Sequence, residues 1–154
     1  MSPIVRLRPA GRRDAETILG CIHGLAEFEN MAALVHNSKR ALVKNGFGKN
    51  PLFNVLLCEV KTNQRWNGVG FALYFLTYST FTGKPTLYLE DLFVQPEFRN
   101  HGFGKHLFWR VAQQAVKKGC GRMEWSVLAW NSRAIDFYKR MGGMAMDDWC
   151  LFRL

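Results

Sequence analysis

Three patterns follow one another between residues 86 and 118, and together they constrain the fold more than any other part of the chain. Residues 86–94 (TLYLEDLFV) are mostly apolar and aromatic, which is typical of a buried strand. Residues 104–118 carry apolar side chains at helical spacing and predict an amphipathic helix. The loop between them contains Gly102 and Gly104. Such a strand–loop–helix unit places backbone N–H groups beside a helix N-terminus, an arrangement that favours an anionic ligand.

The remaining segments predict a single domain over residues 1–154. We expect further strands at 4–9, 52–60, 68–78, 122–130 and 149–154, and helices at 14–27, 38–45 and 131–142. Asn67 and Gly68 lie between the second and third strands, so an antiparallel pair joined by a turn is expected there. The order of the elements predicts an α/β (α+β) fold, in which helices cover a mixed sheet.

The charge and the cysteines limit the class of partner. The formal net charge of +9 favours polyanionic partners, among them phosphate-rich small molecules. The basic residues are dispersed and the aromatic residues fall in core-like strands, so we expect no nucleic acid as a partner. The four cysteines form no Cys-x-x-Cys pair and no His stands at metal-site spacing. We therefore expect reduced thiols and no metal.

The hydropathy of the chain and its first residues indicate where in the cell the protein is expected. No stretch approaches the ~20 apolar residues that a membrane span requires, so no membrane partner is expected. The segment MSPIVRLRPAGRRD has no apolar signal core, which predicts a cytoplasmic protein.

Two familiar phosphate-binding motifs can be tested against the glycine loop. A Walker loop ending in the Gly-Lys pair of this segment requires Gly at position 99 and Ser or Thr at 106, where the chain has Arg99 and His106. The dinucleotide fingerprint requires Gly or Ala at position 107, which is Leu107. The pattern that remains is Arg-x-x-Gly-x-Gly over residues 99–104 (RNHGFG).

This pattern resembles the pyrophosphate loop of the GNAT acetyltransferases, and the order of the elements matches the GNAT fold. The segments GFGKNPLFNVLLCEV, YLEDLFVQPEFRNHGFG and VLAWNSRAIDFYKRMGG are similar to segments of the spermidine/spermine acetyltransferase group. Residues 78–84 (YSTFTGK) look closer to the thialysine N-epsilon-acetyltransferase branch, because Ser79 stands where the polyamine branch has an aspartate. The resemblance implies a mostly antiparallel sheet whose fourth and fifth strands splay apart around acetyl-CoA, the co-substrate.

The resemblance also implies roles for two catalytic side chains. Tyr138 matches the general acid that protonates the departing CoA thiolate, although an aromatic residue at helical spacing is more often a core residue. Glu90 matches the acid that accepts the amine proton through water, with a structural salt bridge as the rival interpretation. In a regular strand Glu90 and Asp91 point to opposite faces, so they are expected not to line one pocket wall. Asp91 is expected to be structural or to contact the substrate.

The binding residues are implied in the same way. The backbone groups of Leu92, Phe93 and Val94 are expected to hold the pantetheine arm as an added strand would. The other expected CoA contacts are Arg99, Asn100, His101, Gly102, Phe103, Gly104, Lys105, Asn131, Arg133 and Ala134. The expected substrate residues are Phe28, Glu29, Glu90, Trp125 and Ser126, with Glu29 attracting a cationic amine.

The activity implied is direct, acetyl-CoA-dependent N-acetylation of a small primary amine. A positive protein repels a polyamine, so a thialysine- or lysine-like amino acid is favoured, and a spermidine/spermine acetyltransferase is the alternative. A non-catalytic CoA-binding sensor is a further alternative, and the presence of both Glu90 and Tyr138 argues against it. Because members of the family are usually homodimers, a homodimer is expected.

Overall fold

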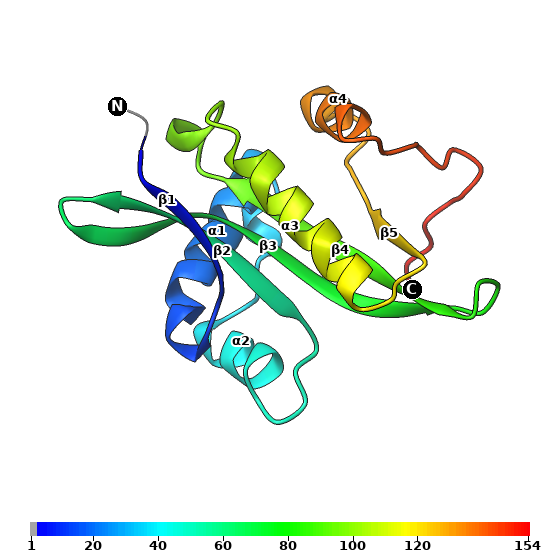
Figure 1. Ribbon diagram of the computed structural model, residues 1–154, viewed down its shortest axis with the longest axis horizontal. Helices are drawn as coiled ribbons and strands as arrows, with labels where there is room; N and C mark the ends of the chain where they lie inside the picture. Colours follow the sequence, from blue (N-terminus) through cyan, green and yellow to red (C-terminus); the bar gives the residue numbers. More distant parts are fainter. Residues whose placement is uncertain (1–2) are drawn as a thin grey trace.

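The computed structural model describes residues 3–154, and over these residues it has one five-stranded sheet in the order β1-β2-β3-β4-β5 (Figure 1). Neighbouring strands are antiparallel except for β4 and β5, which are parallel. This confirms the expected α/β class with a mostly antiparallel sheet. The strands are β1 (Val5–Pro9), β2 (Asn54–Thr62), β3 (Arg65–Ser79), β4 (Lys84–Val94) and β5 (Arg122–Trp125).

Helices cover both faces of the sheet (Figure 1). The helices α1 and α2 pack on one face, and α3 packs on the other. The α-helices are α1 (Ala15–Phe28), α2 (Lys39–Gly46), α3 (Phe103–Lys117) and α4 (Ser132–Arg140), and the 3-10 turns are η1 (Arg12–Asp14), η2 (Ala32–Leu34) and η3 (Pro96–Phe98).

The alternation of side chains along the strands divides the core into two clusters. On β2, Leu56 and Cys58 face α3, whereas Val55 and Leu57 face α1. Successive residues of a strand point to opposite faces, so a strand that is apolar on both faces must be covered on both. The nearly continuous apolar runs of β2, β3 and β4 therefore require the three-layer arrangement that the structure has.

Local signals explain the helix ends. The side chain of Ser38 accepts a hydrogen bond from the N–H of Ala41 (3.1 Å) at the start of α2. Asn131 caps α4 in the same way, through the N–H of Ala134 (3.1 Å). Gly119 has a φ of 68° just after α3, in the left-handed region where glycine is favoured. The expected helices are confirmed to within a few residues at their ends.

The turn between β2 and β3 is not where the Asn67-Gly68 pair predicted it. The chain turns at Asn63 and Gln64, which have φ angles of 48° and 64°, and Arg65 already pairs with Thr62. Asn67 and Gly68 lie inside β3, opposite Val60 and Glu59. Because both strands extend further than their apolar runs, residues 61–67, which are polar except for Trp66, form paired strand ends around a two-residue turn.

Two expectations for the C-terminal part are wrong. The strand expected at 122–130 ends at Trp125, because beyond that residue the chain leaves β4 and loses its pairing partner. The final strand expected at 149–154 is absent, and the segment is an exposed coil. A strand requires a neighbouring strand for its backbone hydrogen bonds. Apolar composition alone could not supply that neighbour to this segment.

The early end of β5 has a consequence for β4. The pairing runs from Thr86 with Arg122 to Leu89 with Trp125 and stops there, while β4 continues to Val94. Among residues 3–154, β4 beyond Leu89 is paired only with β3, and its other edge is open. This opening agrees with the expected splay of the fourth and fifth strands.

Candidate active site

The open edge of β4 leads directly into the glycine loop. Gly102 precedes α3 with a φ of 81°, and Asn100 has a φ of 66°. Both residues therefore adopt the left-handed conformation, which Gly takes without strain and Asn tolerates. This geometry brings the loop round to the N-terminus of α3, where the first backbone N–H groups have no partner within the helix.

Gly104 provides a test of whether this loop fits a close ligand. A Cβ atom at this position would meet protein only at 4.0 Å, on Phe137 and Val94, so packing within the chain does not require glycine here. The absence of a side chain therefore leaves a cradle over the helix start, which suits close approach of a phosphate to the backbone. Phe103 is buried, so only its backbone can face such a ligand, whereas His101 and Lys105 are exposed.

Arg99 points inward from the loop. Its Nε donates a hydrogen bond to the carbonyl oxygen of Val94 at 2.9 Å, and its guanidinium lies 4.7 Å from the ring centre of Phe28. Partial burial lowers the pKa of Arg99, and the nearby charge of Arg133 lowers it further. The residue thus joins the end of β4 to the end of α1, a contact that the sequence pattern did not indicate.

The start of α4 lies against the same loop. Arg133 donates a hydrogen bond from Nη2 to Oδ1 of Asn100 at 3.3 Å. Asn131 and Ala134 are joined by the capping hydrogen bond described above. The residues expected to hold CoA on α4 and those on the glycine loop are therefore adjacent in space, although more than 25 positions separate them in sequence.

Tyr138 belongs to an aromatic cluster on α4, β5 and α3. Its ring centre lies 5.0 Å from that of Trp125, 5.1 Å from Phe137 and 5.9 Å from Phe108. Burial raises the pKa of its hydroxyl, and the charges of Asp91 and Glu29 raise it further. The ring is thus a packed core element, and the hydroxyl stays protonated at neutral pH, as a proton donor requires.

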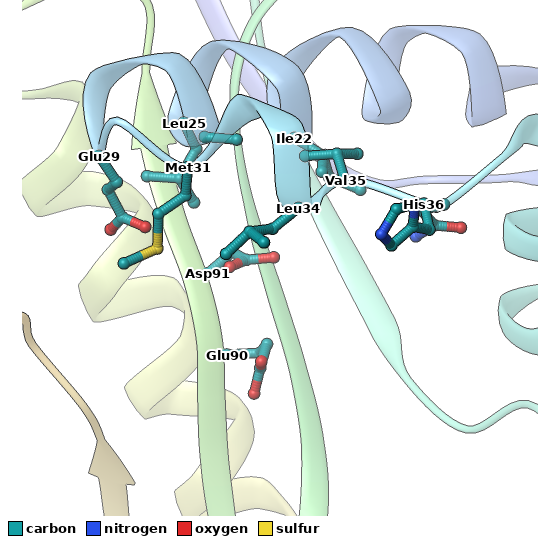
Figure 2. A pocket seen from close by; sticks show the side chains of 11 residues that line it. Ile22, Leu25, Glu29, Met31, Leu34, Val35, His36, Glu90 and Asp91 are labelled. Carbon is teal, nitrogen blue, oxygen red and sulfur yellow. The ribbon is translucent and has the colours of Figure 1, made fainter.

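A cavity of about 370 Å³ lies between α1, the loop that follows it, and β4 (Figure 2). Three carboxylates line it, from Glu29 at the end of α1 and from Glu90 and Asp91 on β4. The remaining lining residues are Ile22, Leu25, Ala26, Met31, Leu34, Val35, His36 and Asn37. The five of these that follow α1, from Met31 to Asn37, were missed as site residues, because a loop without periodic pattern gives no signal of where its side chains lie.

The position of both Glu90 and Asp91 on this cavity overturns the expectation that they face opposite sides. Leu73 pairs with Asp91 and Tyr74 pairs with Leu89, so Glu90 has no partner on β3. The register shift is a β-bulge, which changes the direction of the side chains next to it. The alternation that holds for a regular strand therefore fails at this point of β4.

The three carboxylates differ in surroundings. Burial raises the pKa of Asp91 to about 7, and the negative charges of Glu90 and Glu29 contribute to the rise. Burial also raises the pKa of Glu29. Glu90 is exposed. A cluster of negative charge with a titrating carboxyl near neutral pH is typical of a site that binds a cation or transfers a proton.

The other expected substrate residues border this region. Phe28 lies 6.3 Å, between ring centres, from Trp130, which follows β5, so this contact links the two sides of the β4 edge. Trp125 contacts Tyr138, and the hydroxyls of Ser126 and Tyr88 are hydrogen-bonded at 2.8 Å. Trp130 and Tyr88 were not expected here, because only the tertiary fold brings them next to the residues that were.

Other parts of the described chain offer less chemistry. A second hollow at the β2–β3 turn is lined by Thr62, Asn63, Arg65 and Asn67 and contains no acid or base that titrates near neutral pH. Within residues 3–154, no group of three His, Cys, Asp or Glu side chains is placed to hold a metal ion. No helix in the same range is long and apolar enough to cross a bilayer.

Comparisons with known proteins agree with this geometry. The Acetyltransferase (GNAT) family matches residues 40–143. A thialysine N-epsilon-acetyltransferase of Sus scrofa is 39% identical over 156 residues, which cover 97% of this chain and 91% of that protein. The human spermidine/spermine N(1)-acetyltransferase-like protein 1 is 37% identical over 154 residues, 96% of this chain and 22% of that protein.

A solved structure of the aminoglycoside N-acetyltransferase AAC(6')-Iy in complex with CoA has the same fold. It superimposes with a TM-score of 0.78 over 100% of this chain and 97% of that chain, at 18% identity. The resemblance to the spermidine/spermine group, closer to its thialysine branch, is confirmed by the two sequence relatives. The protein is an acyltransferase enzyme, and its chain belongs to the acetyltransferase (GNAT) family.

Proposed function

We propose that this protein transfers the acetyl group of acetyl-CoA directly to the side-chain amine of a thialysine- or lysine-like amino acid. The observation that carries the proposal is the position of the carboxylate-lined cavity beside the open edge of β4. A cationic amine in that cavity lies next to the strand whose free edge suits the donor. The presence of Tyr138, Glu90 and Asp91 in this region favours an enzyme over a CoA sensor.

The donor side uses backbone groups and a few basic residues. In the proposal, Leu92, Phe93 and Val94 bind the pantetheine arm along the open edge of β4. The first N–H groups of α3 bind the pyrophosphate, supported by the Gly104 cradle described above. Arg133 and Asn131 add contacts from the start of α4, which is hydrogen-bonded to the loop.

The chemistry sets three demands on these residues. The amine, with an ordinary pKa of about 10.4, must lose a proton before it can attack. In the proposal, a carboxylate of β4 accepts that proton. The thioester carbonyl must be polarised as negative charge develops on its oxygen, and the departing thiolate requires a proton. Tyr138 donates that proton, since burial keeps its hydroxyl protonated.

The cavity favours an amine on an aliphatic stem. Glu29, Glu90 and Asp91 attract the cationic end, and the apolar side chains of Ile22 and Leu25 suit a chain of methylene groups. The net charge of +9 opposes capture of a polycation more than that of a zwitterionic amino acid. The porcine relative is a thialysine N-epsilon-acetyltransferase, which supports the same acceptor class.

A polyamine is the second candidate acceptor. Three carboxylates around one cavity would also suit a substrate with several positive charges. The human relative is a spermidine/spermine N(1)-acetyltransferase-like protein, which supports this alternative.

In the proposal, residues 1–154 act as one domain, the protein is cytoplasmic, and two copies of the chain form a homodimer. The C-terminal segment exposes Trp149, Leu151 and Phe152 at 76%, 83% and 91% of their surfaces. Exposed apolar side chains close together in sequence support an interface between two copies. Sedimentation equilibrium of the wild type and of a Trp149→Ser, Leu151→Ser, Phe152→Ser variant measures the mass directly. A monomeric wild type would refute the dimer.

Turnover with a panel of amines tests the proposed reaction. Release of free CoA thiol from acetyl-CoA would be measured with thialysine, lysine, ornithine, spermidine, spermine and a basic peptide. We expect the highest kcat/KM for the amino acids. A higher value for spermidine or spermine would establish the second candidate instead. No turnover with any amine, despite binding of CoA in calorimetry, would refute the transferase proposal for these acceptors.

A further inference from the structure

The two ends of the cavity between α1 and β4 differ in chemistry. Glu29, Glu90 and Asp91 place carboxylates on its wall, whereas His36 and Asn37 line it from the loop between η2 and α2. Figure 2 shows Glu29 at one end of the group of lining side chains and His36 at the other. The cavity therefore has an acidic end and an end formed by nitrogen-bearing side chains.

The side chains of His36 and Asn37 can both donate hydrogen bonds to a ligand. An imidazole ring carries at least one N–H group in either protonation state. Oδ1 of Asn37 accepts a hydrogen bond from the N–H of Ser38 at 2.8 Å, so the NH₂ group of the same amide is left as a donor. Both side chains are exposed, and a ligand that enters from solvent can reach them.

The segment that follows these donors is basic. Residues 36–46 (HNSKRALVKNG) contain Lys39, Arg40 and Lys44 and no Asp or Glu. Lys39 lies 3.3 Å from a carboxylate oxygen of Glu16, and this exposed pair offsets only part of the positive charge. The electrostatic potential therefore becomes more positive from the carboxylate end of the cavity toward its His36 end.

Such a cavity suits a ligand with opposite charges at its two ends. A diamine or polyamine carries ammonium groups at both ends, so one of them would lie beside the donors and the basic segment. An amino acid with a side-chain amine has an ammonium group at one end and a carboxylate at the other. The apolar side chains of Leu34, Val35 and Ile22 also line the cavity and suit the methylene groups between the two charges.

We propose that His36 and Asn37 bind the α-carboxylate of an amino-acid acceptor and thereby make the enzyme prefer amino acids to diamines and polyamines. This assignment rests on the proposed amine N-acetyltransferase function. With the carboxylate bound at His36, the side-chain ammonium group extends toward Glu29 and Asp91, beside the open edge of β4. His36 and Asn37 are specificity residues in this proposal and take part in no covalent step.

The test uses lysine and lysinamide, which differ only in the replacement of the carboxylate by a neutral amide. KM and kcat for each acceptor would be measured at saturating acetyl-CoA. We expect His36→Leu to raise KM for lysine about tenfold with little change in kcat, because a contact made equally in the ground and transition states is lost. The rise for lysinamide should be less than about threefold, since the amide carries no charge. The matched control is His23→Leu, an exposed histidine of α1 outside the cavity lining, and it should retain both wild-type KM values.

Two further variants change the charge at the same end of the cavity. His36→Lys keeps a donor and should bring KM for lysine to within about threefold of the wild type. Asn37→Asp places a negative charge beside the bound carboxylate, so KM should rise for lysine and fall for the diamine cadaverine. These opposite directions would not follow from general damage to the fold.

Three outcomes would overturn the proposal. An equal loss with lysine and lysinamide in His36→Leu would show that His36 serves the amine or the fold rather than the carboxylate. Wild-type KM for lysine in both His36→Leu and Asn37→Asp would remove the carboxylate site and leave the transferase function intact. No turnover of any amine by the wild type would refute the proposed function itself.

A binding measurement reports on the carboxylate site without turnover. Calorimetry would follow lysine as it binds to the complex of the enzyme with CoA. Binding that is about tenfold weaker in His36→Leu than in the wild type would support the site even in an enzyme that does not acetylate lysine. Equal affinity in the two proteins would overturn it.

Discussion

The ring of Tyr138 packs against that of Trp125 with 5.0 Å between the ring centres, and Trp125 is the residue at which β5 stops pairing with β4. The aromatic cluster that holds the tyrosine is therefore built at the point where the two strands part. A proton donor must be held in a fixed position, because its hydroxyl has to lie next to one reacting atom. The packing of the Tyr138 ring beside the opening supplies such a position.

Replacement of Tyr138 by Phe keeps the packed ring and removes the hydroxyl. We expect kcat to fall by about 10²- to 10³-fold, because the thiolate loses its proton donor. Binding of CoA should be unaffected, and the two properties are measured by thiol release and calorimetry. Tyr78→Phe, on an exposed tyrosine of β3, is the matched control. Unchanged turnover in Tyr138→Phe would exclude the hydroxyl from the reaction.

Gly104→Ala tests the cradle at the start of α3. The added methyl group would meet protein only at 4.0 Å, so the fold should tolerate it, whereas a ligand close to the backbone would be displaced. We expect CoA affinity to fall about tenfold, or about 1.4 kcal/mol, in calorimetry.

Gly20→Ala is the control for that change. Gly20 is exposed in α1 and has open space around it, so alanine should stabilise the protein by about 0.5–1 kcal/mol and leave CoA affinity unaltered. Equal CoA affinity in the wild type and both variants would show that no ligand approaches Gly104.

Arg8 joins two carboxylates at the β1–β2 edge. Its guanidinium lies 2.8 Å from Oε1 of Glu59, which is only 5% exposed, and 2.8 Å from Oδ2 of Asp14. Arg8→Met should lower the free energy of unfolding at pH 7 by about 2 kcal/mol, because a buried carboxylate loses one of its two cations. Urea unfolding measures this change.

The same contact makes the effect depend on pH. The hydrogen bond from Arg8 lowers the pKa of Asp14 below its ordinary value. The Arg8–Asp14 contact therefore contributes fully to the stability of the folded state above the unfolded-state pKa of about 3.9. That contribution is lost as the pH falls through the lower pKa that Asp14 has in the folded state. The difference between Arg8→Met and the wild type should shrink below about pH 4. Lys39→Met, which breaks the exposed pair with Glu16, should change stability by less than about 0.5 kcal/mol.

Asp91→Asn should stabilise the protein at and above neutral pH. The pKa of Asp91 is raised to about 7 in the folded state, so ionisation of this carboxyl opposes folding. The destabilisation caused by the ionised carboxylate is absent below the unfolded-state pKa of about 3.9. It grows as the pH rises and is complete above about pH 7. We expect a gain on the order of 2 kcal/mol at pH 8 that disappears near pH 4, measured by urea unfolding.

The control for this prediction is Asp136→Asn, which neutralises an exposed carboxyl of α4 and should leave stability nearly unchanged at both pH values. A gain in Asp91→Asn that is equal at pH 4 and pH 8 would show that the effect arises from packing rather than from the charge.

Local signals predicted the parts of the fold that depend on neighbours in sequence. Ser38 and Asn131 mark the starts of two helices by their own side-chain hydrogen bonds, and Gly102 permits the left-handed turn into α3. The sequence also placed Tyr138 on the helix after Asn131. Each of these features depends on a few adjacent residues, so a single segment contains all the information required.

The sequence by itself therefore determined the family, the order of nearly all elements and the loop that starts α3. Only the tertiary structure decided that Glu90 lies in a bulge and that Asp91 shares its cavity, because a register shift depends on the partner strand β3. The same holds for residues 149–154, which lack a strand to pair with, and for Arg99, whose direction is set by Val94 and Phe28. Hydrogen bonds and electrostatic effects between distant segments are properties of the folded chain, and no local pattern encodes them.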